Sequence, residues 1–150
     1  MEEKNKVQEY QETVVEIKRV SKKTKGGNQI SFTALVVVGD GQGKVGVALG
    51  KAKDVASAIR KGVRLAKKTM IEIPLKGTTI PHPVEYKLKA ARVLLKPARE
   101  GSGLIAGGPV RIIASAAGIK DLVAKILGSR NKAANTWATY EALKLLKLPK

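Results

Sequence analysis

The chain has 150 residues, of which 43% are hydrophobic and none is cysteine, and its formal net charge is +17. This composition predicts one packed domain or two small ones, and it excludes a wholly disordered chain, disulfide bonds and thiolate metal sites. The longest apolar run, residues 34–38, is too short to cross a membrane. Because the acidic N-terminus does not resemble a signal peptide, we expect a cytosolic protein.

Positive charge is concentrated in residues 18–68. This segment contains 13 lysines and arginines but only two acids, Asp40 and Asp54, which gives it a net charge of +11. Residues 1–17 have two bases and five acids, net −3, and residues 69–150 have 14 bases and five acids, net +9. Such clustering is typical of a polyanion-binding protein. Nucleic acid is favoured over an anionic membrane, because no basic amphipathic helix carries the Trp, Phe or Leu face that membrane insertion favours.

The first half predicts a hairpin-based sheet. Residues 1–9 are polar enough to form a loose tail, residues 13–20 favour a strand over a short helix, and residues 21–28 an exposed mobile loop or hairpin tip. Residues 30–38 are rich in β-branched side chains and predict a strand, and Gly39-Asp-Gly-Gln-Gly43 a tight turn. Residues 44–49 predict the returning strand, whose glycines would let another backbone or a phosphate approach.

A helix should follow Asp54, a plausible N-cap. Its apolar stripe is predicted to contain Val55, Ile59, Val63, Ala66 and Met70. The roughly opposite face carries five cations, namely Lys53, Arg60, Arg64, Lys67 and Lys68. An ordinary solvated helix face usually includes acids among its bases, and this one has none, which favours a binding face.

The second half is predicted less sharply. Prolines in residues 74–83 predict a linker between two domains, and residues 84–97 predict one or two strands. Residues 99–108 form a glycine-rich crossing, and Pro109 and Gly118 bracket a short helix. Residues 122–127 fit a strand or part of a helix. The last helix should begin at Ser129 or Asn131 and run to about Leu146, with an apolar stripe of Ala134, Ala138, Ala142, Leu145 and Leu146.

Motifs for nucleotide hydrolysis and catalysis are missing. Neither Gly43-Lys44 nor Gly50-Lys51 has the upstream glycine and the following Ser or Thr of a phosphate-binding loop. The Gly43-Lys-Val-Gly46 match to KH domains falls between predicted strands rather than helices. We interpret Ser102 as a flexible-loop serine, and His82 lacks companion ligands or a catalytic partner. Gly107 and Gly108 fit either an anion-binding helix start or a close protein contact.

The residue types favour RNA read by shape. Aromatic residues make up only 3% of the chain, so stacking on unpaired bases cannot be the main mode of binding. Lysines and arginines suit contacts with phosphates and sugars instead, which indicates structured RNA.

Several segments together resemble one family. They include Arg19-Val-Ser-Lys, Lys25-Gly-Gly, the strand and turn from Ser31 to Gly41, Gly43-Lys-Val-Gly, Gly50-Lys-Ala, Lys96-Pro-Ala, Glu100-Gly-Ser-Gly, Ile105-Ala-Gly-Gly-Pro and Ala117-Gly-Ile. In this order they resemble ribosomal protein S-five of the bacterial small subunit, over about residues 10–145.

This resemblance implies an α+β fold of two domains. Residues 10–73 should form a double-stranded-RNA-binding-like domain, a three-stranded sheet with a helix. Residues 84–150 should form a β-α-β-α domain with a left-handed crossover. The family binds small-subunit rRNA near the head–body junction and close to where mRNA enters, contacts ribosomal proteins S-four and S-eight, and affects decoding accuracy. Residues 19–27 match the loop whose changes give spectinomycin resistance, and Gly103 and Arg111 match the S-four contact region.

We therefore expect a ribosomal, non-enzymatic protein without cofactor, metal or small-molecule substrate. The alternative is a free double-stranded-RNA-binding regulator or RNA chaperone, which would use the same surface. The predicted rRNA-binding residues are Arg19, Lys22, Lys23, Lys25, Gly26, Gly27, Asn28, Lys44, Lys51, Lys53, Arg60, Arg64, Lys67 and Lys68. The predicted protein-interface residues are Ser102, Gly103, Gly107, Gly108 and Arg111.

Overall fold

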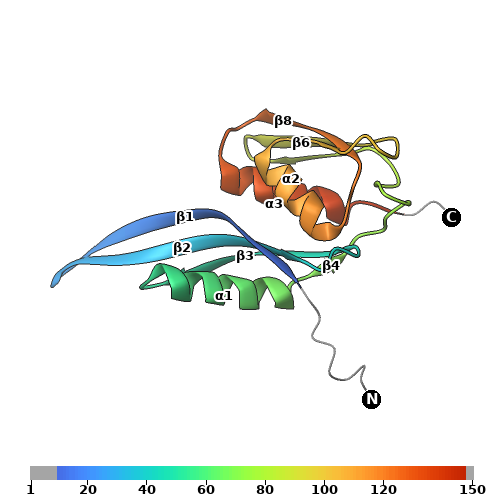
Figure 1. The fold of residues 1–150 in the computed structure, drawn as a ribbon. Helices are drawn as coiled ribbons and strands as arrows, with labels where there is room; N and C mark the ends of the chain where they lie inside the picture. Colours follow the sequence, from blue (N-terminus) through green and yellow to red (C-terminus); the bar gives the residue numbers. More distant parts are fainter. Residues whose placement is uncertain (1–9, 148–150) are drawn as a thin grey trace, which may run out of the picture.

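The computed structural model describes residues 10–147. The tail predicted for residues 1–9 lies outside this range. The described chain forms four layers (Figure 1), in the order helix α1, a first sheet, helices α2 and α3, and a second sheet. This is the predicted α+β class. No helix in the described range is long and apolar enough to span a membrane.

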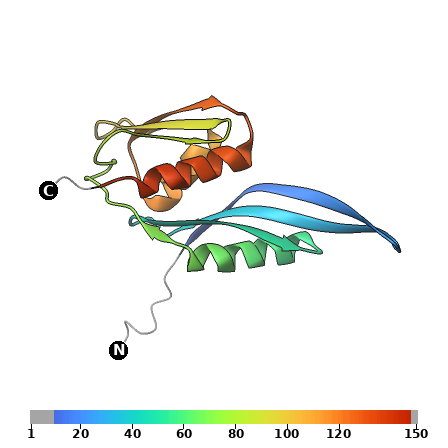
Figure 2. The same cartoon turned by 180° about the vertical axis from the view of Figure 1, so that it is seen from behind.

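The first sheet is antiparallel, with strand order β1-β2-β3-β4. Its strands are β1 (Gln11–Thr24), β2 (Gly27–Gly39), β3 (Lys44–Ala52) and β4 (Ile71–Glu72). The predicted three strands are present, and the two-residue β4 adds a fourth by pairing with Val45 and Lys44. Residues 21–28 belong to the hairpin of β1 and β2, whose register runs to the pair Thr24–Gly27. The hairpin alternative was therefore correct, and Figures 1 and 2 show it extending well beyond the rest of the molecule.

Strand β2 is buried on both faces in its second half. Ala34, Val36 and Val38 pack with helix α1 (Val55–Lys68), while Leu35 and Val37 belong to the larger core shared with the second half of the chain. Alternate side chains of a strand point to opposite faces, so a continuous apolar run is what a doubly covered strand requires.

Helix α1 lies unusually close to the sheet. Its buried residues are Ala58, Gly62 and Ala66, whereas Val55, Ile59 and Val63 of the predicted stripe are only half-buried. A Cβ atom on Gly50 would lie 2.1 Å from the Ala58 carbonyl oxygen, and one on Gly46 would lie 2.2 Å from that of Ala66. The strand glycines therefore admit the helix backbone, one of the two alternatives that the sequence left open. The predicted stripe was right for Ala66, and Ile59 and Val63 pack against the same core, but this close packing places the small residues Ala58 and Gly62 at the contact.

The second sheet has the order β5-β6-β8-β7, with β7 parallel to β8 and the other pairs antiparallel. Its elements are β5 (Val84–Leu88), β6 (Ala91–Pro97), β7 (Leu104–Ile105), α2 (Gly108–Ala117), β8 (Leu122–Gly128) and α3 (Lys132–Lys144). Residues 84–97 thus form two strands, and residues 122–127 belong to a strand. Helix α3 ends before the predicted Leu146, with Leu145 as its C-cap and 47% exposed.

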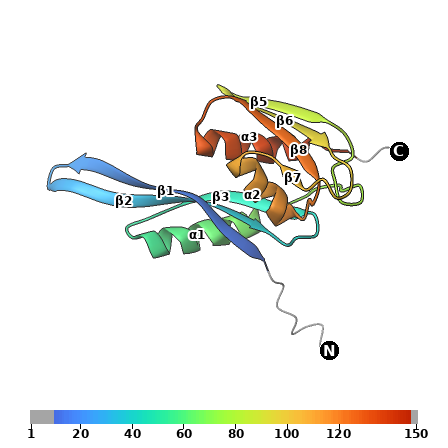
Figure 3. The same ribbon diagram turned by 45° about the horizontal axis from the view of Figure 1, so that its top comes forward.

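The two sheets are joined through the turn after β2 and the end of α2, which lie together in Figure 3. The Asp40 carboxylate holds the turn by accepting from the backbone N–H groups of Gln42 and Lys44, at 2.8 and 3.0 Å. Gly41 and Gly43 then donate to the carbonyl oxygens of Ala116 and Ala117, at 3.0 and 2.7 Å. The predicted tight turn is confirmed, and its glycines also serve this joint.

Candidate nucleic-acid interface

A row of cations crosses from the hairpin to helix α1 along the edge of β3. One groove of about 610 Å³ is lined by residues that include Lys22, Lys51 and Lys53. A second hollow of about 420 Å³ is lined by Lys51, Arg60, Lys61 and Arg64 together with Ala52 and Ser57. Because Lys51 lines both, the two form one continuous surface. We call it the basic strip, and its members are Lys22, Lys51, Lys53, Arg60, Lys61 and Arg64.

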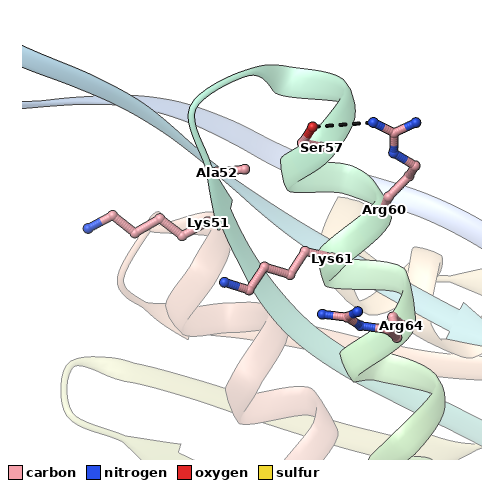
Figure 4. A pocket seen from close by; sticks show the side chains of 6 residues that line it. All are labelled: Lys51, Ala52, Ser57, Arg60, Lys61 and Arg64. Carbon is pink, nitrogen blue, oxygen red and sulfur yellow. Dashed lines mark hydrogen bonds between the residues drawn. The ribbon is translucent and has the colours of Figure 1, made fainter.

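Local structure explains why these side chains meet. Beyond Val45, no strand within residues 10–147 pairs with the outer side of β3, since β4 pairs only with Lys44 and Val45. Asp54 then starts α1 by accepting from the Ser57 N–H at 3.1 Å, which returns the chain along the same edge. Figure 4 shows Lys51, Lys61 and Arg64 extending to the same side, with Arg60 on the far side of the helix, where it donates to Ser57 Oγ.

The strip is free of carboxylate partners within the described residues. The three ion pairs found there involve Lys67, Arg92 and Lys144, none of which belongs to the strip. Two acids lie nearby. The Asp54 carboxylate caps the helix, and the side-chain and backbone hydrogen bonds from Ser57 hold the pKa of Asp54 below its usual value. Glu12 lines a hollow together with Arg60 and Arg64, but its ion pair is with Lys67. The cations therefore remain available to an external polyanion.

Lys67 and Lys44 are among the predicted residues that lie outside the strip. Lys67 is on the β1 side of α1, where its ammonium lies 3.5 Å from a Glu12 carboxylate oxygen and 5.2 Å from the centre of the Tyr10 ring. Lys44 begins β3, seven residues from Lys51, or roughly 23 Å along an extended strand. In the register of the sheet, Lys44 lies opposite Glu72 of β4. Neither residue lines the two hollows that define the strip, although Lys67 lines a neighbouring hollow with Arg60 and Arg64.

The remaining predicted residues of the first half are exposed. Lys68 is in the last turn of α1, where a cation interacts favourably with the helix dipole. Arg19, Lys23, Lys25, Gly26, Gly27 and Asn28 lie on the distal hairpin, with Lys25 and Gly26 at its turn. One strip member, Lys61, was missing from the prediction. Its position three residues before Arg64, on the same side of a helix, was the available signal.

The predicted protein-interface residues lie around the start of α2. Gly108 and Arg111 line a hollow of about 480 Å³ that also includes Gln11 and Thr13 of β1. Gly107 is the N-cap of α2, and a Cβ there would lie 2.9 Å from a methyl group of Ile126. Ser102 and Gly103 are on the preceding loop.

Asp121 fixes that loop. Its side chain is only 3% exposed and accepts from Thr78 Oγ1 and from the N–H groups of Gly101 and Gly103, at 3.1 and 2.8 Å. The hydroxyl bond from Thr78, followed by the bond from Gly103, holds the pKa of Asp121 below its usual 3.8. One carboxylate thus connects residues 74–83, the Ser102 loop and β8, a connection that no local sequence pattern revealed.

This contact predicts an acid-dependent stability. Because the folded-state pKa of Asp121 is lowered, its carboxylate adds to the free energy of unfolding above pH 3.8. This stabilisation disappears as the pH falls through the folded-state pKa. We expect Asp121→Asn to lower the unfolding midpoint at neutral pH. The midpoint of this variant should then fall less than that of the parent chain as the pH is lowered. Thermal unfolding from about pH 7 to about pH 2 tests this. Glu100→Gln, which removes an exposed carboxylate of the same loop, should unfold like the parent chain; an unchanged midpoint in Asp121→Asn would contradict the assignment.

The described residues contain no cluster of side chains suited to binding a metal ion. No group of three or more His, Asp or Glu residues within residues 10–147 could hold a metal ion. The ring of His82 is occupied by backbone contacts, with Nδ1 2.9 Å from the Pro83 carbonyl oxygen and Nε2 accepting from the Lys147 N–H at 3.0 Å.

The fold and the strip define a class, that of small basic α+β proteins with unpaired cations along one strand edge and one helix, a pattern typical of RNA-binding proteins. Comparison with known families identifies a particular family within this class. Residues 10–74 match the family model "Ribosomal protein S5, N-terminal domain", and residues 86–150 match "Ribosomal protein S5, C-terminal domain".

Curated relatives agree with the family models. Proteins named "Small ribosomal subunit protein uS5" from Campylobacter jejuni strain RM1221 and from C. jejuni serotype O:23/36 strain 81-176 are each 53% identical to this chain over 145 residues. These alignments cover 97% of this chain and 99% of each relative. The chain belongs to the ribosomal protein S5 family.

Proposed function

We propose that this protein is a structural, non-catalytic constituent of the small ribosomal subunit that binds small-subunit rRNA through the basic strip. The observation that carries the proposal is the set of strip cations without carboxylate partners in the described chain, on a chain 53% identical to small-subunit proteins over nearly its whole length. A surface of this kind contacts phosphates, and it suits folded RNA read by shape.

The hairpin extends the strip outward. Arg19 lies beside the last pair of β2 and β3, Phe32–Ala52, and the distal part of the hairpin beyond it carries Lys23 and Lys25 on a ribbon of two strands only. We expect this ribbon to contact rRNA near the head–body junction, close to where mRNA enters, and to be the segment at which substitutions confer spectinomycin resistance. In contrast to the helix face, it can bend toward its target because a two-stranded ribbon has few tertiary contacts.

The second half is proposed to contact neighbouring proteins. Gly108 and Arg111 share a hollow with the start of β1, and Asp121 fixes the Ser102–Gly103 loop beside it. We assign this region to ribosomal protein S-four and to the support of translational accuracy, and expect S-eight as a further neighbour. Residues 10–73 and 84–150 would form the two units, joined by residues 74–83, a division supported by the two sheets and the two family models.

Sedimentation of cell extracts tests the proposal. The tagged protein should sediment with small subunits at one copy per subunit and remain bound after washing in high salt. A pool that stays at the top of the gradient, together with binding to unrelated duplex RNA, would instead support a free RNA-binding regulator and overturn the ribosomal assignment.

A further inference from the structure

The end of the second sheet that overhangs the hairpin carries a separate group of cations. Figures 1 and 2 show the β5–β6 turn and the β8–α3 connection at this end, on the side of the first sheet opposite α1. Four exposed cations lie in and beside these loops: Lys87 near the end of β5, Lys89 in the turn, Arg130 in the connection and Lys132 at the start of α3. We call these four residues the second basic surface. None of them has an ion-pair or side-chain hydrogen-bond partner within residues 10–147.

The two loops form one fixed unit. The Ser129 N–H donates to the Ala90 carbonyl oxygen at 3.1 Å, which places Lys89 and Arg130 on either side of the same junction. Ser129 is itself held from the helix side, since its Oγ accepts from the Asn131 N–H at 3.0 Å and its carbonyl oxygen from Asn135 Nδ2 at 3.1 Å. The cations therefore project from an ordered backbone, and binding does not have to order it.

Lys89 occupies a position that its backbone does not favour. Its φ of 55° is the one positive value at a non-glycine residue among the described residues. A lysine in this left-handed region costs conformational energy that Gly or Asn would largely avoid. Such a residue at an exposed turn indicates a role for its side chain rather than for the turn.

The chemistry of the surface favours RNA over a protein partner. Protein interfaces are depleted in lysine at their centre and depend on buried aromatic anchors, and neither loop has an aromatic residue. Glu85, two residues before Lys87 on β5, is paired with Arg92. Lysines and arginines without acids or aromatics suit phosphate groups of a nucleic-acid backbone.

We propose that the second basic surface is a second contact site for RNA phosphates, so that structured RNA held by the basic strip also touches the other half of the protein. This inference rests on the proposed RNA-binding function and adds a second, independent site to it. Sequence reasoning placed every rRNA contact in the first half, because Lys89 and Arg130 are 41 residues apart and only the fold brings them together.

Salt-dependent binding to small-subunit rRNA tests the inference. In a triple variant, Lys89→Gln, Arg130→Gln and Lys132→Gln, the slope of log K against log salt should fall by about 2, because each phosphate contact contributes about 0.7–0.9. The control triple, Lys96→Gln, Lys120→Gln and Lys125→Gln, removes the same charge from exposed positions of the same half and should keep the parent slope. Equal slopes in both triples, or the parent slope in the first, would overturn the proposal.

Two further measurements separate the possible failures. Lys89→Asn should raise the unfolding midpoint, because Asn tolerates a positive φ, and yet weaken rRNA binding; raised stability with unchanged binding counts against the site. A variant with Lys51, Lys61 and Arg64 changed to Glu, measured in parallel, tests the basic strip by itself. If that variant loses binding and the Lys89 triple does not, the proposed function survives and this inference fails. Parent-like RNA binding with lost co-assembly of a neighbouring protein would assign the surface to a protein and also overturn it.

Discussion

Changing Lys51, Lys61 and Arg64 to glutamate should weaken binding to duplex RNA by about 100-fold or more at moderate salt. These three side chains extend to the same side of the β3 edge and line one hollow, so they can contact successive phosphates of one backbone. Reversing the charge of these side chains removes three phosphate contacts and adds repulsion between the new carboxylates and the RNA backbone. The slope of log K against log salt should fall by about 2–3, since each contact contributes about 0.7–0.9.

The measurement is fluorescence anisotropy with a duplex of about 16 base pairs, the length that a double-stranded-RNA-binding domain spans. Its matched control reverses Lys96, Lys120 and Lys125, which gives the same net charge with the strip intact. The strip variant should unfold at the same temperature as the parent chain, because all three substituted side chains are exposed. If both triples weaken binding equally, net charge rather than the strip determines affinity.

Gly50→Ala should lower the free energy of unfolding by about 3 kcal/mol and the unfolding midpoint by about 6–12 °C. The new methyl carbon would lie 2.1 Å from the Ala58 carbonyl oxygen and 2.4 Å from the Gly62 nitrogen. Both are backbone atoms of α1, so no side-chain rotation relieves the clash and the helix has to move away from β3. Lys51 and Lys61 would separate, and RNA binding should weaken together with stability.

Gly26→Ala is the matched control for this substitution. Gly26 lies in the hairpin turn with a φ outside the left-handed region, and an added Cβ there would have no atom of the described residues within 4 Å. Its unfolding midpoint should stay close to that of the parent, within the range usual for surface substitutions. Denaturant and thermal unfolding of both variants measure the difference. A Gly50→Ala protein as stable as the Gly26→Ala protein would show that α1 does not lie as close to β3 as described.

Local patterns in the sequence predicted much of the first half. The β-branched run in β2, the turn at Gly39–Gly43 and the Asp54 cap are each determined by neighbours within a few residues, because strand alternation, turn conformation and helix capping are local. The position of β4 and the burial of Ala58 and Gly62 were not predictable in this way. They depend on how closely α1 packs on β3, which the strand glycines permit but do not require.

The amino-acid sequence by itself determined that the bases are segregated from the acids, that β2, its turn and the capped helix α1 form where they do, and that the family is recognisable. Only the tertiary structure decided which bases act together. It placed Lys51 beside Lys61, put Lys67 against Glu12, and joined the loops of Lys89 and Arg130 through one backbone hydrogen bond. The physical reason is that a side chain's neighbours across a sheet edge or between loops follow from strand order and the docking of α1, which are set by burial of the whole core.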